Sequence, residues 1–134
     1  MKHVAVMGYG TVGSGVYEVL TKNKEVVSKN VGEELNVKYV LDLREFPGDP
    51  VENVLTHNFD DILNDEEVCV VAEVMGGIEP AYTFTKKCLL AGKSVSSFSC
   101  SLVKINIYCT PKCRIVASFF CILGFFLRFG IDPF

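Results

Sequence analysis

Short apolar runs alternate with amphipathic stretches along the first 95 residues, and this alternation predicts an α/β fold. The predicted strands lie at residues 2–7, 36–42 and 68–72, residues 54–56 form a short edge strand, and residues 93–95 begin a further strand. The continuous apolar character of residues 2–7 is typical of a parallel strand that is covered on both faces, and residues 68–72 are apolar and β-branched. The order of strands and helices predicts a doubly wound parallel sheet.

Two longer segments carry the spacing of helices. The first is expected to run from Thr11 into residues 22–29, with an apolar face of Val12, Val16, Val19 and Leu20. The second is expected to begin at Pro80 and to end at Gly92, because proline suits the first helical position and glycine the C-terminal cap. Its predicted buried stripe consists of Ala81, Phe84, Cys88 and Ala91.

A glycine-rich turn separates the first strand from the first helix, and its sequence is Gly8-Tyr9-Gly10-Thr11-Val12-Gly13. In this G-x-G-x-x-G pattern, Gly8 permits a tight turn, Gly10 lets the backbone approach a pyrophosphate, and Gly13 lets the helix pack close to the strand. The unpaired N–H groups of the first helical turn then point at the anion. A glycine turn of another α/β protein is the alternative, and the position after the first strand favours the dinucleotide site.

The composition changes after residue 95. From residue 94 onward the chain holds four of the six cysteines and seven of the ten phenylalanines, and Asp132 is the one acidic residue there. A soluble enzyme rarely changes composition this sharply within one domain. We therefore predict a nucleotide-binding domain over residues 1–95 and an atypical apolar tail over residues 96–134.

Residues 115–127 of this tail carry no charge, but the run is shorter than the roughly 20 apolar residues that a spanning helix needs. Three interpretations remain: a buried helix, an interfacial or membrane-prone segment, or non-native coding such as a frameshift or a retained intron. The abrupt change of composition favours the last.

The tail also contains a C-x₃-C pair, Cys109 and Cys113, with Cys100 and Cys121 on either side. A structural zinc site normally shows two close pairs of ligands, so we predict no metal site. His3 is expected to be a strand residue and His57 a loop residue, neither of them a ligand.

Four segments together resemble homoserine dehydrogenase in its N-terminal nucleotide-binding domain: VAVMGYGTVGSGVYEVL, VKYVLDLREFPGDP, VVAEVMGG and IEPAYTFTKKCLLAGKSV. The resemblance covers about residues 1–95 and implies a truncated Rossmann-like fold. In that family NAD(P) exchanges hydride between L-homoserine and L-aspartate 4-semialdehyde, on the route to threonine and methionine.

By this resemblance the pyrophosphate is held by Gly8, Tyr9, Gly10, Thr11, Val12 and Gly13. Gly76 and Gly77 form the loop near the nicotinamide ribose. A glycine pair after a buried strand also lies at the carboxyl edge of a parallel sheet, where ligands bind. A simple turn is the alternative for this pair.

Asp42 ends the second strand, where a carboxylate can bond both ribose hydroxyls of NAD. Arg44 follows two residues later and can instead meet the 2′-phosphate of NADP. The two side chains compete for one pocket, and a solvated loop is the third interpretation. The sequence leaves the choice between NADP and NAD open.

The family continues after this domain with a Thr-Ser-Asn-Lys type of segment, whose lysine is implicated in proton transfer. Here Cys100 falls at the position of that lysine, and Lys104 is out of register. We therefore predict no catalytic residue and a fragment that recognises NAD(P) without turning over alone. The alternative is a non-catalytic nucleotide-binding or interaction module whose apolar tail docks a partner or a membrane.

The net charge of −3 gives no reason to expect a nucleic-acid partner, so a small-molecule nucleotide is the expected partner. The N-terminal apolar run is too short for a secretory leader, which predicts a cytoplasmic location with free thiols. A homodimer is implied for the full-length family only, because the pairing surfaces lie largely outside the resemblance.

Overall fold

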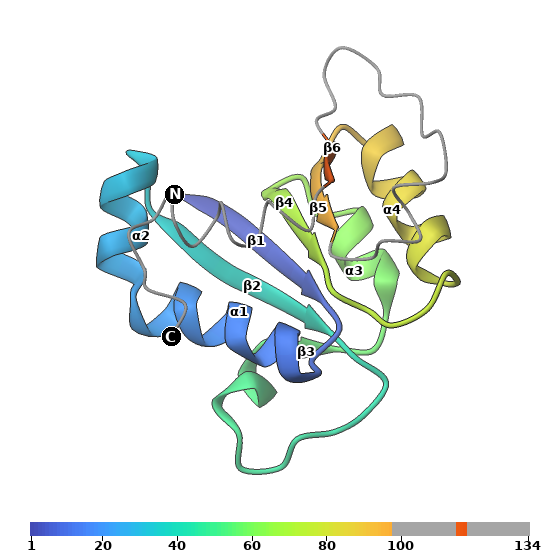
Figure 1. The fold of residues 1–134 in the computed structure, drawn as a ribbon, viewed down its shortest axis with the longest axis horizontal. Coiled ribbons are helices and arrows are strands. Elements are labelled where there is room, and N and C mark those ends of the chain that lie inside the picture. The colour runs from blue at the N-terminus through green and yellow to red at the C-terminus, as the bar shows by residue number, and fades with distance from the viewer. Residues whose placement is uncertain (98–114, 118–134) are drawn as a thin grey trace.

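The computed structural model describes residues 1–97 and 115–117 and shows one parallel sheet flanked by helices (Figure 1). The strands within these residues are β1 (Lys2–Met7), β2 (Leu35–Leu41), β3 (Leu55–Thr56), β4 (Val68–Glu73), β5 (Ser94–Ser97) and β6 (Ile115–Ala117). Their spatial order is β3-β2-β1-β4-β5-β6, and every neighbouring pair is parallel. The predicted Rossmann-like α/β fold is confirmed, with its switch point between β1 and β4.

Helices cover both faces of the sheet. They are α1 (Thr11–Lys22), α2 (Lys24–Val31), α3 (Phe59–Leu63) and α4 (Ala81–Leu90), together with a short 3₁₀ helix at Pro50–Asn53. One core forms where α1 and α2 pack, and a second core forms under α3 and α4. β1 contributes to both cores. Val4 and Val6 lie in the core with α1 and α2, and Ala5 and Met7 lie in the core with α3 and α4. This is the two-faced burial that its continuous apolar sequence predicts.

The helix expected to run from Thr11 into residues 22–29 ends at Lys22, the first residue of that region, and Asn23 separates it from a second helix, α2. Asn23 has φ −103° and ψ 25°, ends α1 and begins α2. Its N–H donates to the carbonyl of Val19 at 3.1 Å, and its own carbonyl accepts from the N–H of Val27 at 3.0 Å. The break turns α2 so that Leu20 and Val27 both reach the same core.

The buried stripe of α4 differs from the prediction at its end. Ala81 and Cys88 are fully buried as expected, but Ala91 is exposed because the helix ends one residue before it. Thr85 and Leu89 are buried instead.

The sequence predicts a loop over residues 73–77 after the apolar run of residues 68–72, and this prediction is wrong for Glu73. It is the last residue of β4, paired in register with Met7 on one side and Ser97 on the other. Its side chain is fully buried.

Ile115–Ala117 forms a strand next to β5, so the buried-helix interpretation is wrong for these three residues. Cys100, Lys104, Cys109, Cys113, Cys121 and the rest of the apolar run lie outside the described residues. Within residues 1–97 and 115–117, no helix has the length and apolarity needed to cross a bilayer. The same residues contain no group of three His, Cys, Asp or Glu side chains arranged to hold a metal ion.

Candidate nucleotide-binding site

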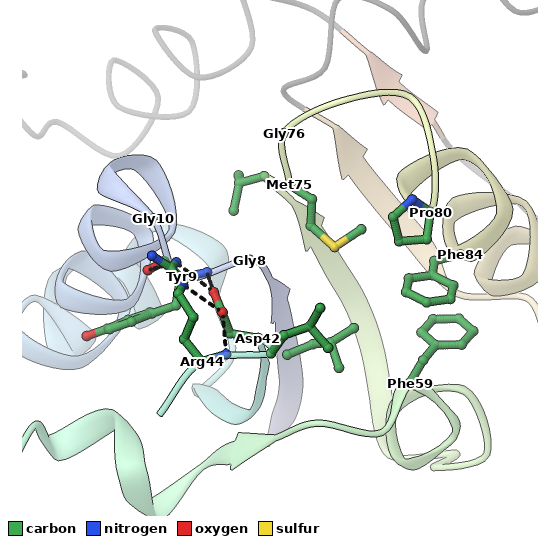
Figure 2. Close-up of a pocket in the computed structure, with 13 residues that line it drawn as sticks. Gly8, Tyr9, Gly10, Asp42, Arg44, Phe59, Met75, Gly76, Pro80 and Phe84 are labelled. Atoms are coloured by element: carbon green, nitrogen blue, oxygen red, sulfur yellow. Dashed lines mark hydrogen bonds and ion pairs between the residues drawn. The ribbon is translucent and has the colours of Figure 1, made fainter. Parts of the chain in front are cut away.

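A cavity of about 480 Å³ opens at the carboxyl ends of β1, β2 and β4 (Figure 2). This is the edge of a doubly wound sheet where ligands bind, at the point where the strand order reverses. One side of the cavity is polar and is built from the glycine turn and the residues after β2. The other side is apolar and is built from α3, α4 and the loop after β4.

The glycine turn after β1 requires glycine at two positions. Gly8 has φ +102°, and a Cβ there would lie 3.1 Å from the carbonyl oxygen of Val74 in the loop after β4. A Cβ on Gly13 would lie 1.9 Å from the carbonyl oxygen of Gly8, so α1 packs directly on the turn. The expected roles of Gly8 in the tight turn and of Gly13 in the close packing of the helix are confirmed. Gly10 is exposed and has open space where a Cβ would stand.

The side chain of Tyr9 fixes this turn by packing against two aromatic rings and by a hydrogen bond to Asp49. Tyr9 is 8% exposed, and its ring makes edge contacts with the rings of Tyr17 and Phe46, whose centroids lie 5.9 Å and 4.8 Å away. Its hydroxyl donates to Oδ1 of Asp49 at 3.2 Å. Burial, followed by this hydrogen bond, raises the pKa of Tyr9 to about 12, so the hydroxyl stays a donor at neutral pH.

Asp42 lies just past β2 and receives four hydrogen bonds. Its Oδ2 accepts from the N–H of Tyr9 at 2.8 Å and from Nη2 of Arg44 at 3.0 Å. Its Oδ1 accepts from the backbone N–H and from Nε of Arg44, both at 3.0 Å. The Arg44 side chain holds the pKa of Asp42 well below its usual range, and burial only partly opposes this.

Arg44 also contacts the backbone of the glycine turn and the ring of Phe46. Its Nη2 donates to the carbonyl of Tyr9 at 3.2 Å, and its guanidinium lies 5.2 Å from the centroid of the Phe46 ring. The Arg44 side chain is 62% exposed, whereas that of Asp42 is 9% exposed. The guanidinium of Arg44 is therefore accessible at the cavity, and the carboxylate of Asp42 is largely buried and neutralised by Arg44.

Sequence reasoning missed the apolar side of the cavity. The rings of Phe59 and Phe84 stack with centroids 4.0 Å apart and planes at 7° to one another. Pro80 lies beside them, and Met75 extends between this pair and the glycine turn (Figure 2). The sequence signal that could have identified this side is an aromatic residue in the first turn of each helix, Phe59 in α3 and Phe84 in α4. These residues give one side of the cavity an apolar surface.

Among the predicted site residues, the cavity lining includes Gly8, Tyr9, Gly10, Asp42, Arg44 and Gly76. The others lie outside the lining: Thr11, Val12 and Gly13 in the first turn of α1, and Gly77 in the loop after β4. Gly77 adopts φ +90°, a conformation that favours glycine.

This parallel sheet, with a glycine turn at its switch point and a carboxylate after β2, defines a dinucleotide-binding domain of the Rossmann type. A family model described as the NAD binding domain of homoserine dehydrogenase matches residues 8–106. The chain belongs to this family, and its cofactor class is NAD(P). The resemblance inferred from the sequence is thereby confirmed.

Comparisons with individual proteins agree with this assignment. The homoserine dehydrogenase of Lactococcus lactis is 35% identical over 111 residues, which is 78% of this chain and 26% of the relative. The crystal structure of S. aureus homoserine dehydrogenase superposes with a TM-score of 0.64 at 30% identity, over 72% of this chain and 25% of the other. That of Thiobacillus denitrificans gives 0.65 at 32% identity, over 72% and 23%. The chain thus spans about a quarter of the length of the relatives it matches.

Proposed function

We propose that this chain is the cofactor-binding part of a homoserine dehydrogenase, which interconverts L-homoserine and L-aspartate 4-semialdehyde. The observation that carries the proposal is the cavity at the switch point, lined by the glycine turn and the Asp42–Arg44 pair, in a chain of this family. When bound, NAD(P) supplies hydride chemistry, and the protein supplies binding and orientation.

The residues around the cavity suit the parts of a dinucleotide. The N–H groups of Thr11, Val12 and Gly13 precede the first hydrogen bond of α1, from Ser14 to Gly10, and so remain available to a pyrophosphate. Asp42 and Arg44 lie where the adenosine ribose binds in this fold. The stacked Phe59 and Phe84 rings give the adenine an apolar wall.

Gly10→Val tests nucleotide binding with little cost to the fold. Gly10 has φ −87° and ψ −158°, which valine tolerates, and nothing lies within 4 Å of the Cβ position. We expect NAD(P) at a hundred times its Kd to stabilise the wild type by about 2.7 kcal/mol. The variant should unfold at nearly the wild-type temperature without nucleotide and should gain almost nothing from it. A thermal-shift titration measures the rise in unfolding temperature with nucleotide. An equal rise in the wild type and in Gly10→Val would count against this site.

We also propose that residues 1–134 alone do not oxidise homoserine. By sequence, Cys100 stands at the position of the family's lysine, and a thiol cannot donate an ammonium hydrogen bond. Acid–base assistance contributes about 10²–10⁴-fold and positioning of the reactants up to about 7–11 kcal/mol. We therefore expect no homoserine-dependent formation of NAD(P)H, and none after Cys100→Lys, which restores one group without the substrate pocket. Formation of NAD(P)H that Gly10→Val abolishes would overturn the proposal.

A further inference from the structure

Glu73 is a fully buried carboxylate beside the cavity. It does not line the cavity itself. One oxygen, Oε1, accepts the backbone N–H of Met75 at 2.8 Å. The other, Oε2, accepts the hydroxyl of Ser97, which is 5% exposed. Burying a carboxylate is costly even when it is hydrogen-bonded, so packing alone does not account for a glutamate here.

The loop that Glu73 holds contributes directly to the cavity. Val74, Met75 and Gly76 all line it. The loop also rests on the glycine turn, because the Cβ position of Gly8 is 3.2 Å from the backbone nitrogen of Met75. The peptide of Met75 is thus fixed between the carboxylate of Glu73 and the turn that is proposed to bind pyrophosphate.

The second hydrogen bond of Glu73 reaches the next strand. Ser97 is the last residue of β5 and is the register partner of Glu73 in the parallel pair of β4 and β5. A single buried carboxylate therefore links the loop after β4 to the carboxyl end of β5. Both are parts of the sheet edge where the cavity opens.

We propose that Glu73 is a positioning residue of the NAD(P) site, which fixes the loop of residues 74–76 against the glycine turn and ties it to the end of β5. This inference rests on the proposed function. Loss of the carboxylate leaves the N–H of Met75 without its acceptor and releases the loop from β5, so the cavity loses its shape on the β4 side.

The test compares Glu73→Ala, Glu73→Gln and Ser97→Ala with the wild type. Lys93→Met is the matched control, because Lys93 is 6% exposed and its Nζ donates to the carbonyls of Asp65 and Val68 at the opposite end of the sheet. Calorimetry measures the Kd for NADP and NAD at a temperature where circular dichroism shows each variant folded. Hydrogen exchange of the Met75 amide reports the hydrogen bond directly.

We expect Glu73→Ala to raise the Kd at least about tenfold and to speed exchange of the Met75 amide, because a buried donor loses its partner. Ser97→Ala should raise the Kd by about threefold. Glu73→Gln keeps an acceptor for Met75 and can donate to Ser97, so it should recover most of the affinity. Lys93→Met should lower the unfolding temperature and leave the Kd within about twofold, since the site is distant.

Wild-type affinity and wild-type Met75 protection in Glu73→Ala would overturn the inference while leaving the proposed function in place. If Glu73→Ala does not fold, unchanged affinity and unchanged exchange of the Met75 amide in Ser97→Ala would overturn it, because Ser97→Ala removes the hydrogen bond that ties Glu73 to β5. Absence of NAD(P) binding by the wild type would instead refute the proposed function, and the inference with it.

Discussion

Gly13→Ala is expected to destabilise the domain by about 3 kcal/mol or more, at or beyond the usual range for overpacking. The added Cβ would lie 1.9 Å from the carbonyl oxygen and 2.8 Å from the carbonyl carbon of Gly8. These are backbone atoms of a turn that is itself pressed against Val74. A side-chain rotation therefore cannot relieve the clash, and α1 must move away from the turn.

Gly15→Ala supplies a matched control two residues further along α1. Nothing lies within 4 Å of a Cβ at that position, and alanine favours a helix interior over glycine by about 1 kcal/mol. The same chemical change is thus expected to have opposite signs at the two sites. Urea unfolding followed by circular dichroism should place the midpoint of Gly13→Ala well below that of the wild type and that of Gly15→Ala at or above it. Equal midpoints for the two variants would show that Gly13 does not set the packing of α1.

Local patterns in the sequence were sufficient to predict most of the fold. A continuous apolar strand such as β1 implies two covered faces, and the G-x-G-x-x-G turn places the first helix and the carboxyl edge of the sheet together. The close packing at Gly13 follows from the same motif. These features depend on neighbours in the chain, which a single sequence displays.

Features that depend on distant contacts were not predictable in the same way. Neither a proline nor a glycine marks the break at Asn23, which is required for Leu20 and Val27 to share a core. Phe59 and Phe84 stack only because α3 and α4 lie side by side on one face. Apolar spacing alone could not identify this pairing.

The contacts of the charged residues at the site were likewise not predictable from the sequence. The sequence predicts Glu73 in the loop after the apolar run of residues 68–72, yet Glu73 ends β4, and its partner Ser97 lies on the neighbouring strand. The sequence predicts that the side chains of Asp42 and Arg44 compete for one pocket. The structure shows that they form an ion pair with one another and that both hydrogen-bond the backbone of Tyr9.

Arg44→Ala is expected to shift the preference of the domain towards NAD. In the structure Arg44 occupies both oxygens of Asp42, so a ribose of NAD has to displace it before its hydroxyls can donate to the carboxylate. A 2′-phosphate, in contrast, can use the exposed guanidinium directly. Charge-assisted hydrogen bonds contribute about 1.5–3 kcal/mol, so the affinity for NADP should fall by about 10- to 100-fold while that for NAD is kept or improved.

Asp42→Ala should move the ratio of the two affinities in the opposite direction, because it removes the carboxylate that repels a 2′-phosphate and leaves Arg44 unpaired. Lys22→Ala is the control for a lost positive charge, since Lys22 lies at the far end of α1 in an exposed ion pair with Glu18. Titration of both nucleotides against all four proteins gives the ratios. Opposite shifts in the Arg44 and Asp42 variants, with none in the control, would assign cofactor choice to this ion pair. A ratio unchanged in both variants would remove the pair from the site and leave the glycine turn and the stacked phenylalanines as its recognition elements.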